Sequence, residues 1–152
     1  MSCITKVSYN VIINGSASPF FHAEHGLQQG CPLSPLLFLL IMEGLSLLIV
    51  EERRVGRLQG IKITNDCILT HLLFVNDVLI FLNGDGDSSA FLSLLQLFCR
   101  ATSMECNARK STISSTGCSP HEIQYAHQRF PFTLLPLDDG LKYVGFRLKP
   151  LH

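Results

Sequence analysis

The sequence predicts an α+β fold in which helices pack on one face of an antiparallel sheet. The first observation is the order of the elements: short apolar segments ending in turn residues precede, separate and follow two longer segments with helical periodicity. The second is the composition, because 152 residues with 47% hydrophobic and 16% charged side chains suffice to bury one core. Since no repeat or low-complexity linker interrupts the chain, we expect one domain over residues 1–152.

The first predicted element is a β-hairpin over residues 5–22. Apolar residues alternate with polar ones before the dipeptide Asn14-Gly15, and Phe20 and Phe21 follow it. Asn-Gly between two such segments is the strongest short-range signal for a hairpin, because both residues readily adopt the positive φ angles of a tight turn. We therefore predict a strand, a two-residue turn and a second strand.

A loop rich in glycine and proline then leads into a long helix. Ser34 is a favoured N-cap residue and Pro35 suits the first helical position, so the helix is predicted to begin at Pro35. It continues to about Arg53 and is apolar nearly all round, which predicts burial on several sides. Its uninterrupted apolar run, residues 36–42, is shorter than the roughly 20 residues that span a bilayer. We expect no membrane segment.

Short strands are predicted after this helix, at residues 61–64, 67–74 and 78–82, where apolar segments are separated by turn-forming residues. The last two strands form an apolar hairpin with the carboxylate of Asp77 at its tip. The loop 83–89 lacks the central glycine and the terminal glutamate of an EF-hand calcium loop, so we interpret it as a helix cap.

A second, amphipathic helix follows this cap. Its apolar stripe recurs at helical spacing and is interpreted as core rather than as a cofactor site. The stripe consists of Phe91, Leu94, Leu95, Phe98 and Thr102. A strand rich in threonine, isoleucine and serine, a short helix opening at Ser119-Pro120 and a terminal strand or hairpin arm over residues 141–148 complete the predicted fold.

The charge balance alone argues against a nucleic-acid partner. Lys and Arg number 12 and Asp and Glu number 12, whereas binding to a phosphate backbone normally requires excess positive charge. Lys142, Arg147 and Lys149 form a small basic patch, which a solvated tail also explains. The six cysteines form no C-x-x-C pair and no segment resembles a signal peptide, so we expect an intracellular protein, with nucleus and cytoplasm both open.

Four segments, taken in order, resemble the reverse transcriptases of non-LTR (LINE-type) retrotransposons. Residues 26–38, GLQQGCPLSPLLF, are similar to the family's R-Q-G-x-P-L-S-P-x-L-F block, and residues 72–81, LLFVNDVLIF, to its F-A-D-D-x-x-x-F hairpin. Asn107 with Lys110-Ser111 is similar to its N-x-x-K-S block, and residues 142–146, KYVGF, to its Y-L-G block near the primer. The resemblance implies a partial polymerase palm that lacks the upstream fingers, the strand of the first catalytic aspartate and the downstream thumb.

The resemblance also implies nucleotidyl transfer with two divalent ions, Mg²⁺ or Mn²⁺, which several carboxylates must hold. In the family, one carboxylate comes from a strand upstream of the first block and two stand side by side at the hairpin tip. Here Asn76 occupies the position of the first hairpin aspartate, and Asp77 remains as the catalytic metal ligand. Before Gly26 the chain has Glu24 as its only acid, so the upstream aspartate is not in this chain.

The same resemblance assigns further site residues. Gly30 would let backbone approach a nucleotide closely and Gln29 would present its amide to a base, although an ordinary helix-entry loop has the same composition. Lys110 would neutralise a triphosphate, although a solvated surface lysine is the commoner case. The predicted nucleotide- and template-binding residues are Gln29, Gly30, Pro32, Ser34 and Lys110, and the predicted primer-side residues are Tyr143 and Gly145.

The function implied by the resemblance is RNA-directed DNA polymerisation, with an RNA template and a DNA primer as partners. Because an amide brings no negative charge to a metal ion, we expect this chain to be catalytically inactive. The alternative is a non-catalytic remnant that binds nucleic acid or protein, or that self-associates, through exposed apolar surface. A membrane partner is not expected.

Overall fold

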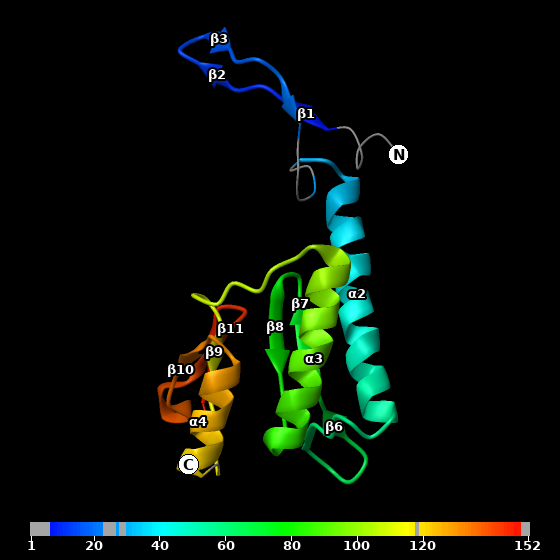
Figure 1. Cartoon of the computed structure of the whole chain (residues 1–152), viewed down its shortest axis with the longest axis vertical. Helices are drawn as coiled ribbons and strands as arrows, with labels where there is room; N and C mark the ends of the chain where they lie inside the picture. The colour runs from blue at the N-terminus through cyan, green and yellow to red at the C-terminus, as the bar shows by residue number, and fades with distance from the viewer. Residues whose placement is uncertain (1–6, 23–26, 28–29, 118, 150–152) are drawn as a thin grey trace. The chain divides into compact units, whose positions relative to one another are not determined.

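The computed structural model describes residues 7–22, 27, 30–117 and 119–149 (Figure 1). The chain divides into two compact units, residues 1–41 and residues 42–152. Both long helices and short β-ladders occur among the described residues, so the predicted α+β class is confirmed. The two units differ in burial, and each has its own set of strands.

The first unit contains a hairpin arm, residues 8–22, built from four short strands. These are β1 (Ser8–Tyr9), β2 (Ile12–Ile13), β3 (Ser16–Ala17) and β4 (Phe21–His22). β1 pairs with β4 and β2 with β3, both antiparallel. Asn14 and Gly15 form the turn with φ angles of 51° and 82°, which confirms the predicted hairpin. Residues 5 and 6 of the prediction lie outside the described residues.

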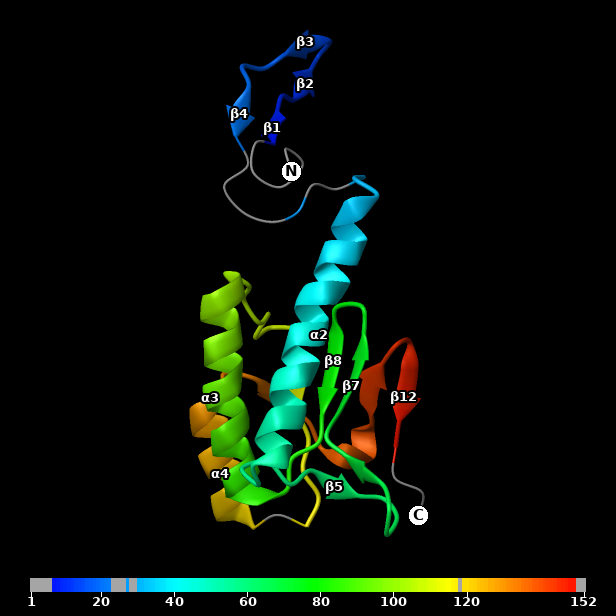
Figure 2. The same cartoon turned by 90° about the vertical axis from the view of Figure 1, so that its right-hand side faces the viewer.

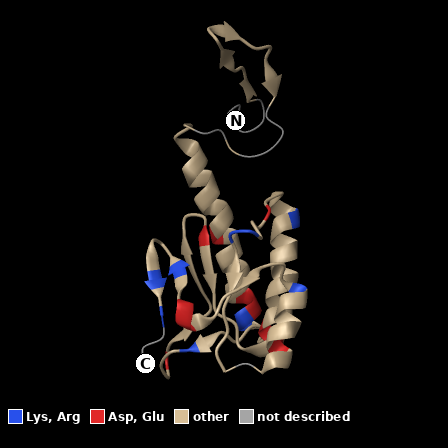
Figure 3. Ribbon diagram, turned by 90° about the vertical axis from the view of Figure 1, so that its left-hand side faces the viewer, with Lys and Arg blue, Asp and Glu red and all other residues tan. Residues whose placement is uncertain are grey.

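The hairpin arm buries none of its side chains. Its sequence holds no Lys, Arg, Asp or Glu (Figure 3), and its large apolar residues face solvent. The exposed members are Val11, Ile12, Ile13, Phe20 and Phe21. The arm is therefore held together by its ladder and its turn rather than by a core of its own.

Helix α2 (Leu33–Arg54) begins two residues earlier than predicted. Ser34 therefore lies in the first turn instead of at the N-cap, and its N–H donates to the carbonyl oxygen of Cys31 at 3.1 Å. Pro35 fits this turn because the first amide groups of a helix have no partner within the helix.

The burial of α2 also differs from the prediction. In the second unit its buried residues are Met42, Leu45 and Ile49, which form one stripe at helical spacing. Leu47 and Val50, on other sides of the helix, are exposed. The expectation of burial on several sides is therefore wrong. An apolar composition allows a helix to be buried, but the number of sides that are buried depends on how many other elements pack against the helix.

Among the described residues, α2 is also the helix that is long and apolar enough to cross a membrane, with a mean hydropathy of 2.3 over 18 residues. The sequence-based prediction of no membrane segment used the length of the uninterrupted apolar run, residues 36–42, which ends at Glu43. A mean hydropathy over 18 residues can remain high although the window contains this one charged residue. The core helix of a soluble protein meets the same criterion. Length and composition therefore do not make α2 a membrane span.

The described part of the second unit adds α3 (Gly84–Thr102), α4 (Pro120–Arg129) and the short helix η1 (Leu137–Asp139). Its strands are β5 (Ile61–Lys62), β6 (Ile68–Leu69), β7 (His71–Phe74), β8 (Asp77–Ile80), β9 (Thr112–Ile113), β10 (Thr133–Leu134), β11 (Leu141–Tyr143) and β12 (Phe146–Leu148).

These strands form separate two-stranded ladders instead of the one antiparallel sheet that was predicted. β5 pairs with β6, β7 with β8 and β11 with β12, all antiparallel. β9 and β10 are parallel, and α4, which lies between them in the chain, belongs to the crossover that a parallel pair needs. Figure 2 shows α2 and α3 on the same side of the β7–β8 hairpin, as the predicted one-sided helical layer requires.

The core of the second unit lies between its helices and the segments that follow them. The predicted stripe of α3 is confirmed at three buried positions, while Leu95 and Thr102 are half-buried. α4 begins at the predicted signal, with Ser119 and Glu122 forming a reciprocal capping box. The buried apolar residues are Met42, Leu45, Ile49, Leu58, Phe91, Leu94, Phe98 and Phe130.

Asp87 is a buried carboxylate, with 2% of its surface exposed. Its oxygens accept hydrogen bonds from the N–H groups of Gln59, Gly60 and Asn83 at 2.8, 2.8 and 2.9 Å. It thereby joins the segment after α2, the segment after β8 and the first turn of α3. The prediction of a capping loop over residues 83–89 is therefore only partly right: residues 84–89 already belong to α3, and Asn83, its N-cap residue, makes no side-chain capping bond.

Gly60 leaves no room for a side chain. Its φ angle is 72°, and a Cβ built there would lie 2.7 Å from the carbonyl oxygen of Leu69 and 2.8 Å from Cγ2 of Thr70. The backbone conformation and the close contacts both require glycine. The connection from α2 to β5 therefore lies so close to the end of β6 that a residue with a side chain does not fit at position 60.

Candidate active site

The β7–β8 hairpin carries the predicted catalytic residues. Phe74 pairs with Asp77, and the two residues between them, Val75 and Asn76, form the turn. Asn76 therefore lies in the turn itself, while Asp77 is the first residue of β8, and both are exposed. The hairpin predicted from the sequence, with its carboxylate at the tip, is present.

The two faces of this hairpin have different surroundings. Cross-strand partners share a face, so Asp77 lies on the same face as the pair formed by Leu72 and Leu79. His71 lies on the opposite face, where its ring bonds to Ser46 of α2. Asp77 is therefore on the face turned away from α2, beside its cross-strand partner Phe74, an exposed apolar side chain.

The turn of this hairpin is strained. Val75 has a φ angle of 52°, in the left-handed region that favours glycine, asparagine and aspartate. A side chain with a Cβ costs roughly 1–2 kcal/mol there, and a β-branched one is an outlier. The strain lies directly beside Asn76 and Asp77, so the contacts of the two strands must hold the turn in place.

The donor set at this tip does not fit a centre of two divalent ions. In the described ranges, no group of three or more His, Cys, Asp or Glu side chains could hold a metal ion. Asp77 and the amide oxygen of Asn76 together offer one negative charge, whereas two Mg²⁺ or Mn²⁺ ions need several carboxylates. Asp77 alone can supply a charged oxygen to a single cation here.

The predicted residues of the first block belong to the first unit. Gln29 lies outside the described residues. Gly30 has a φ angle of 80°, and no described atom lies within 4 Å of a Cβ built there, so its backbone angle requires glycine. Pro32 is exposed, and Ser34 is half-buried in the first turn of α2. Their roles toward a nucleotide or a template stay predictions.

Asn107 organises the turn that carries Lys110. Its carbonyl oxygen accepts hydrogen bonds from the N–H groups of Lys110 and Ser111 at 3.1 and 3.0 Å, and its Oδ1 accepts one from the N–H of Arg109 at 3.2 Å. The hydroxyl of Ser111 donates to the same carbonyl at 2.9 Å. The N-x-x-K-S spacing thus has a structural basis: the asparagine fixes the turn, and the lysine is exposed on it.

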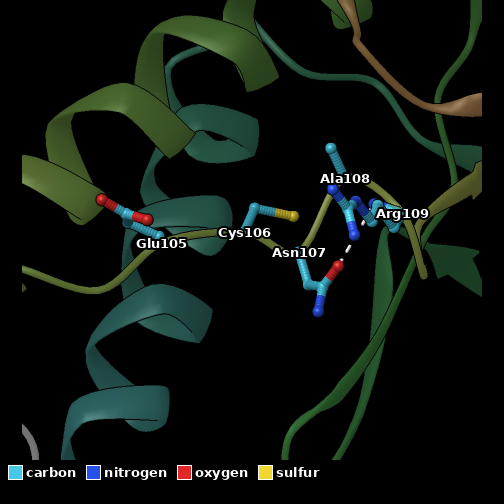
Figure 4. A pocket seen from close by; sticks show the side chains of 5 residues that line it. All are labelled: Glu105, Cys106, Asn107, Ala108 and Arg109. Carbon is cyan, nitrogen blue, oxygen red and sulfur yellow. Dashed lines mark hydrogen bonds between the residues drawn. The ribbon is translucent and has the colours of Figure 1, made fainter.

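An open pocket of about 550 Å³ is formed by this turn and the residues before it (Figure 4). In Figure 4 the carboxylate of Glu105 points away from Arg109, while the sulfur of Cys106 points toward it. The sequence pattern marks Asn107 and Lys110 but not the other residues around this pocket, because a charged residue in a turn looks the same whether it lines a pocket or is solvated. The lining residues are Glu105, Cys106, Asn107, Ala108 and Arg109.

The predicted primer-side residues lie in the β11–β12 hairpin. Tyr143 pairs with Phe146, and the turn between them, Val144 and Gly145, has φ angles of 50° and 80°. Such a turn favours glycine at Gly145 whatever the function of the hairpin. Tyr143 is half-buried and Phe146 is 72% exposed. Contact with a primer stays a prediction for both Tyr143 and Gly145.

Two cations of the predicted basic patch lie on the other face of the β11–β12 hairpin. Lys142 and Arg147 are cross-strand partners, and Figure 3 shows basic residues on both strands. Arg147 Nη1 donates to the carbonyl oxygen of Asp139 at 3.1 Å. This part of the patch therefore belongs to an ordered hairpin and not to a solvated tail.

Comparison with known proteins identifies the family. A family model described as reverse transcriptase (RNA-dependent DNA polymerase) matches residues 1–148. The chain belongs to the reverse transcriptase family. The match confirms the resemblance drawn from the four sequence blocks. Enzymes of this family work with divalent metal ions and a nucleic-acid template and primer.

Similar proteins include part of a retrotransposon polyprotein. The retrovirus-related Pol polyprotein from type-1 retrotransposable element R2 of Popillia japonica is 27% identical over 151 residues, which is 95% of this chain and 24% of that protein. An uncharacterised mitochondrial protein of Arabidopsis thaliana is 45% identical over 67 residues, 43% of this chain and 55% of that protein. The matched regions cover about a quarter and about half of these relatives. The first similarity agrees with the non-LTR resemblance.

Proposed function

We propose that this chain is the palm of a reverse transcriptase-like nucleotidyltransferase in which Asp77 is the remaining hairpin ligand for a divalent ion. We further propose that the 152-residue chain alone does not catalyse DNA synthesis. The observation that carries the proposal is the donor set at the β7–β8 tip, where one carboxylate stands beside the amide of Asn76. Family membership supports nucleotidyl transfer as the chemistry.

The missing negative charge is the physical reason for the proposed inactivity. In phosphoryl transfer with two ions, one ion activates the attacking 3′-hydroxyl and both stabilise the charge that develops. The amide of Asn76 can coordinate a cation but carries no charge, so it removes a Coulomb attraction that is worth several kcal/mol near a protein surface. Since each increment of about 1.36 kcal/mol in the barrier is tenfold in rate, the loss amounts to orders of magnitude. Glu24, the only acid before the first block, is not an aspartate on a strand of the family's type.

The remaining site residues receive proposed roles in the same reaction. The first block, with Gln29, Gly30 and Pro32, shapes the pocket for the nucleotide and the RNA template. Lys110, exposed on its turn, approaches the triphosphate. The β11–β12 hairpin supports the DNA primer through Tyr143. Exposure of Lys110 and the adjacent open pocket support access for a ligand of this kind.

Primer extension on an RNA template tests the proposal, with Mg²⁺ and with Mn²⁺. We expect no nucleotide incorporation above that of Asp77→Ala. Asn76→Asp is expected not to rescue synthesis, because no upstream aspartate is present in this chain. Asp66→Ala, at an exposed position between β5 and β6 and outside the β7–β8 hairpin, is the control. Template-dependent synthesis that Asp77→Ala abolishes and Asp66→Ala preserves would disprove the proposed inactivity.

A non-catalytic binding role is the second candidate. The exposed apolar side chains of the hairpin arm and the exposed Leu72 and Phe74 of the β7–β8 hairpin favour it. Two experiments over a range of salt concentrations distinguish nucleic-acid binding from protein association. Fluorescence anisotropy measures binding to single-stranded RNA, and sedimentation of the free chain measures self-association. Binding that weakens steeply with salt identifies a nucleic-acid module, and self-association insensitive to salt identifies a protein interface.

A further inference from the structure

The hairpin arm has two edges, and the two are not alike. β1 and β2 lie along one side of the arm, and β3 and β4 lie along the other (Figure 2). We call the side formed by residues 8–13 the first edge and the side formed by residues 16–22 the second edge. An edge of a sheet presents backbone N–H and C=O groups that can pair with a further strand.

The second edge is interrupted by an extra residue and a proline. Between the β1–β4 and β2–β3 ladders, the first edge has residues 10 and 11, whereas the second edge has residues 18–20. One of these is Pro19, which has no N–H to donate to another strand. An extra residue in one strand is a β-bulge, and bulges and prolines both hinder pairing at an edge. The second edge is therefore closed to a further strand.

The first edge has no such protection. The carbonyl oxygen of Val11 accepts from the N–H of Ser18 at 2.8 Å, and the N–H of Val11 donates to Oγ of Ser18 at 2.9 Å. Since neighbouring residues of a strand direct their backbone groups to opposite sides, Asn10 and Ile12 direct theirs outward. Residues 8–13 contain no proline and no charged side chain. The first edge is therefore open to a further strand.

The arm alone has too few strands to be stable by itself. An isolated two-stranded hairpin is marginally stable in water, whereas three or more strands with an apolar face support one another. The arm has such a face, because Tyr9, Val11 and Ile13 alternate along the first edge. The ring of Tyr9 lies beside that of Phe21 on this face, with 6.0 Å between the ring centroids. None of these four side chains is buried, so the face lacks the additional strands that would stabilise it.

We propose that the first edges of two copies of this chain pair antiparallel and join the two arms into one four-stranded sheet. A two-fold axis perpendicular to the sheet relates the copies, so both use the same surface and their apolar faces lie on the same side.

The absence of charge is what makes a second copy the suitable partner. Two-fold symmetry brings residues near the axis close to their own counterparts, where like charges would repel. The arm has no Lys, Arg, Asp or Glu, so it meets a copy of itself without this cost. The outer strands of the joined sheet are the two second edges, whose bulge and Pro19 prevent further addition. Association therefore ends at a dimer and does not continue into a fibre.

The proposal rests on the second candidate role, in its protein-interface form, and gives that role a definite partner. It does not involve Asp77 or nucleotidyl transfer. A ladder between two segments of this length buries a small area, so the expected association is reversible and depends on the concentration of the chain.

Sedimentation velocity of the full chain over a range of concentrations tests the proposal. We expect a monomer–dimer equilibrium that changes little with salt, because the first edge carries no charge. Asn10→Lys brings two cations within about 8 Å of each other across the axis and should raise the dissociation constant about tenfold or more.

Ala17→Lys is the matched control, because it adds the same charge at an exposed position of the second edge. Position 17 faces the same side of the arm as Ile12 and Asn10. In the dimer its two copies lie three strand spacings apart, about 14 Å, which exceeds the Debye length of about 8 Å at physiological ionic strength. We expect this variant to dimerise like the native chain.

Opposite charges test whether both copies use the first edge. Asn10→Glu alone should weaken association as Asn10→Lys does, whereas an equimolar mixture of the two variants should dimerise at least as strongly as the native chain. Amide exchange in the native chain needs no variant. Protection of the Ile12 N–H should rise with the concentration of the chain, while that of the Ala17 N–H should not change.

Three results would overturn the proposal. The first is a native chain that stays monomeric, without concentration-dependent protection of Ile12. The second is a dimer that Asn10→Lys leaves intact, since association then uses another surface, and the third is growth beyond a dimer. Failure of the other proposals is seen separately: DNA synthesis that depends on Asp77 disproves the proposed inactivity, and RNA binding is measured by anisotropy whether or not the chain dimerises.

Discussion

The hairpin arm and the β7–β8 hairpin have the same architecture and different surroundings. Each pairs short strands across a two-residue turn. The arm buries none of its side chains, whereas the β7–β8 hairpin bonds to α2 through His71 and is held at its base by Asp87. Local sequence is therefore enough to specify a hairpin, but the elements that cover one face decide how firmly it is held.

The turn sequences differ in the opposite sense, because the hairpin with fewer supporting contacts has the turn residues better suited to their backbone angles. The arm has Asn14-Gly15, the dipeptide best suited to positive φ angles, while the β7–β8 hairpin has Val75 in a conformation that valine disfavours. Tertiary contacts in the second unit offset this strain. The arm lacks such contacts among its described residues, so its turn contributes a larger share of its stability.

The largest expected effect comes from truncating a buried side chain in the core of the second unit, compared with the same truncation of an exposed side chain in the hairpin arm. Ile49→Ala, at a residue with 0% exposure, is expected to destabilise the second unit by about 2–5 kcal/mol because it leaves a cavity. Ile12→Ala, at a residue with 73% exposure in the arm, should change stability by less than about 0.5 kcal/mol. Urea unfolding followed by circular dichroism measures both, and equal losses would contradict the comparison.

A smaller effect is expected from the carboxylate at the base of the β7–β8 hairpin. In Asp87→Asn, one amide oxygen cannot accept all three backbone N–H groups, and the new NH₂ group opposes at least one of them. We expect a loss of about 1–3 kcal/mol in unfolding free energy and faster amide exchange at Gly60 and Asn83. Asp85→Asn, at an exposed position in the same helical turn, is the control. A loss of equal size in the control would refute the role given to Asp87.

The smallest effects are expected from exchanging the turn residues. Val75→Asn should stabilise the β7–β8 hairpin by about 1 kcal/mol, because asparagine tolerates the left-handed conformation. Asn14→Val should destabilise the arm by a similar amount for the same reason. Amide exchange on each hairpin reports the two changes separately. A loss of stability in Val75→Asn would show that the valine side chain makes a contact that outweighs its backbone strain.

Features with a local cause could be predicted from the sequence. Asn14-Gly15 specifies the turn of the arm, and the periodicity of Phe91, Leu94 and Phe98 specifies the buried face of α3. The capping signal at Ser119 likewise marks the start of α4. Each of these depends on residues within a few positions of one another, so the pattern holds the relevant information.

Features that depend on distant residues could not be predicted. The partners of Asp87 include Gln59, 28 positions away in the chain, and no local pattern marks this pair. The parallel pairing of Thr112 with Thr133 is equally non-local. α2 was expected to be buried on several sides, because its composition does not reveal how many elements cover it.

The candidate site was predicted in part. The positions of Asn76 and Asp77 at a hairpin tip follow from two adjacent apolar strands, and the structure contains that hairpin. The organising role of Asn107 emerges only from its hydrogen bonds with the turn. His71 had no sequence signal, because a histidine in an apolar strand reveals nothing about a serine 25 positions earlier.

Gly60 offers a way to separate selection on folding from selection on catalysis. In a deep mutational scan scored for abundance, every substitution at Gly60 should be depleted, because a Cβ would clash with Leu69 and Thr70. Substitutions at the exposed Asn76 should leave abundance unchanged. Among natural copies, a lineage that retains glycine at position 60 while position 76 drifts would be one in which the folded chain is kept for a purpose other than polymerisation.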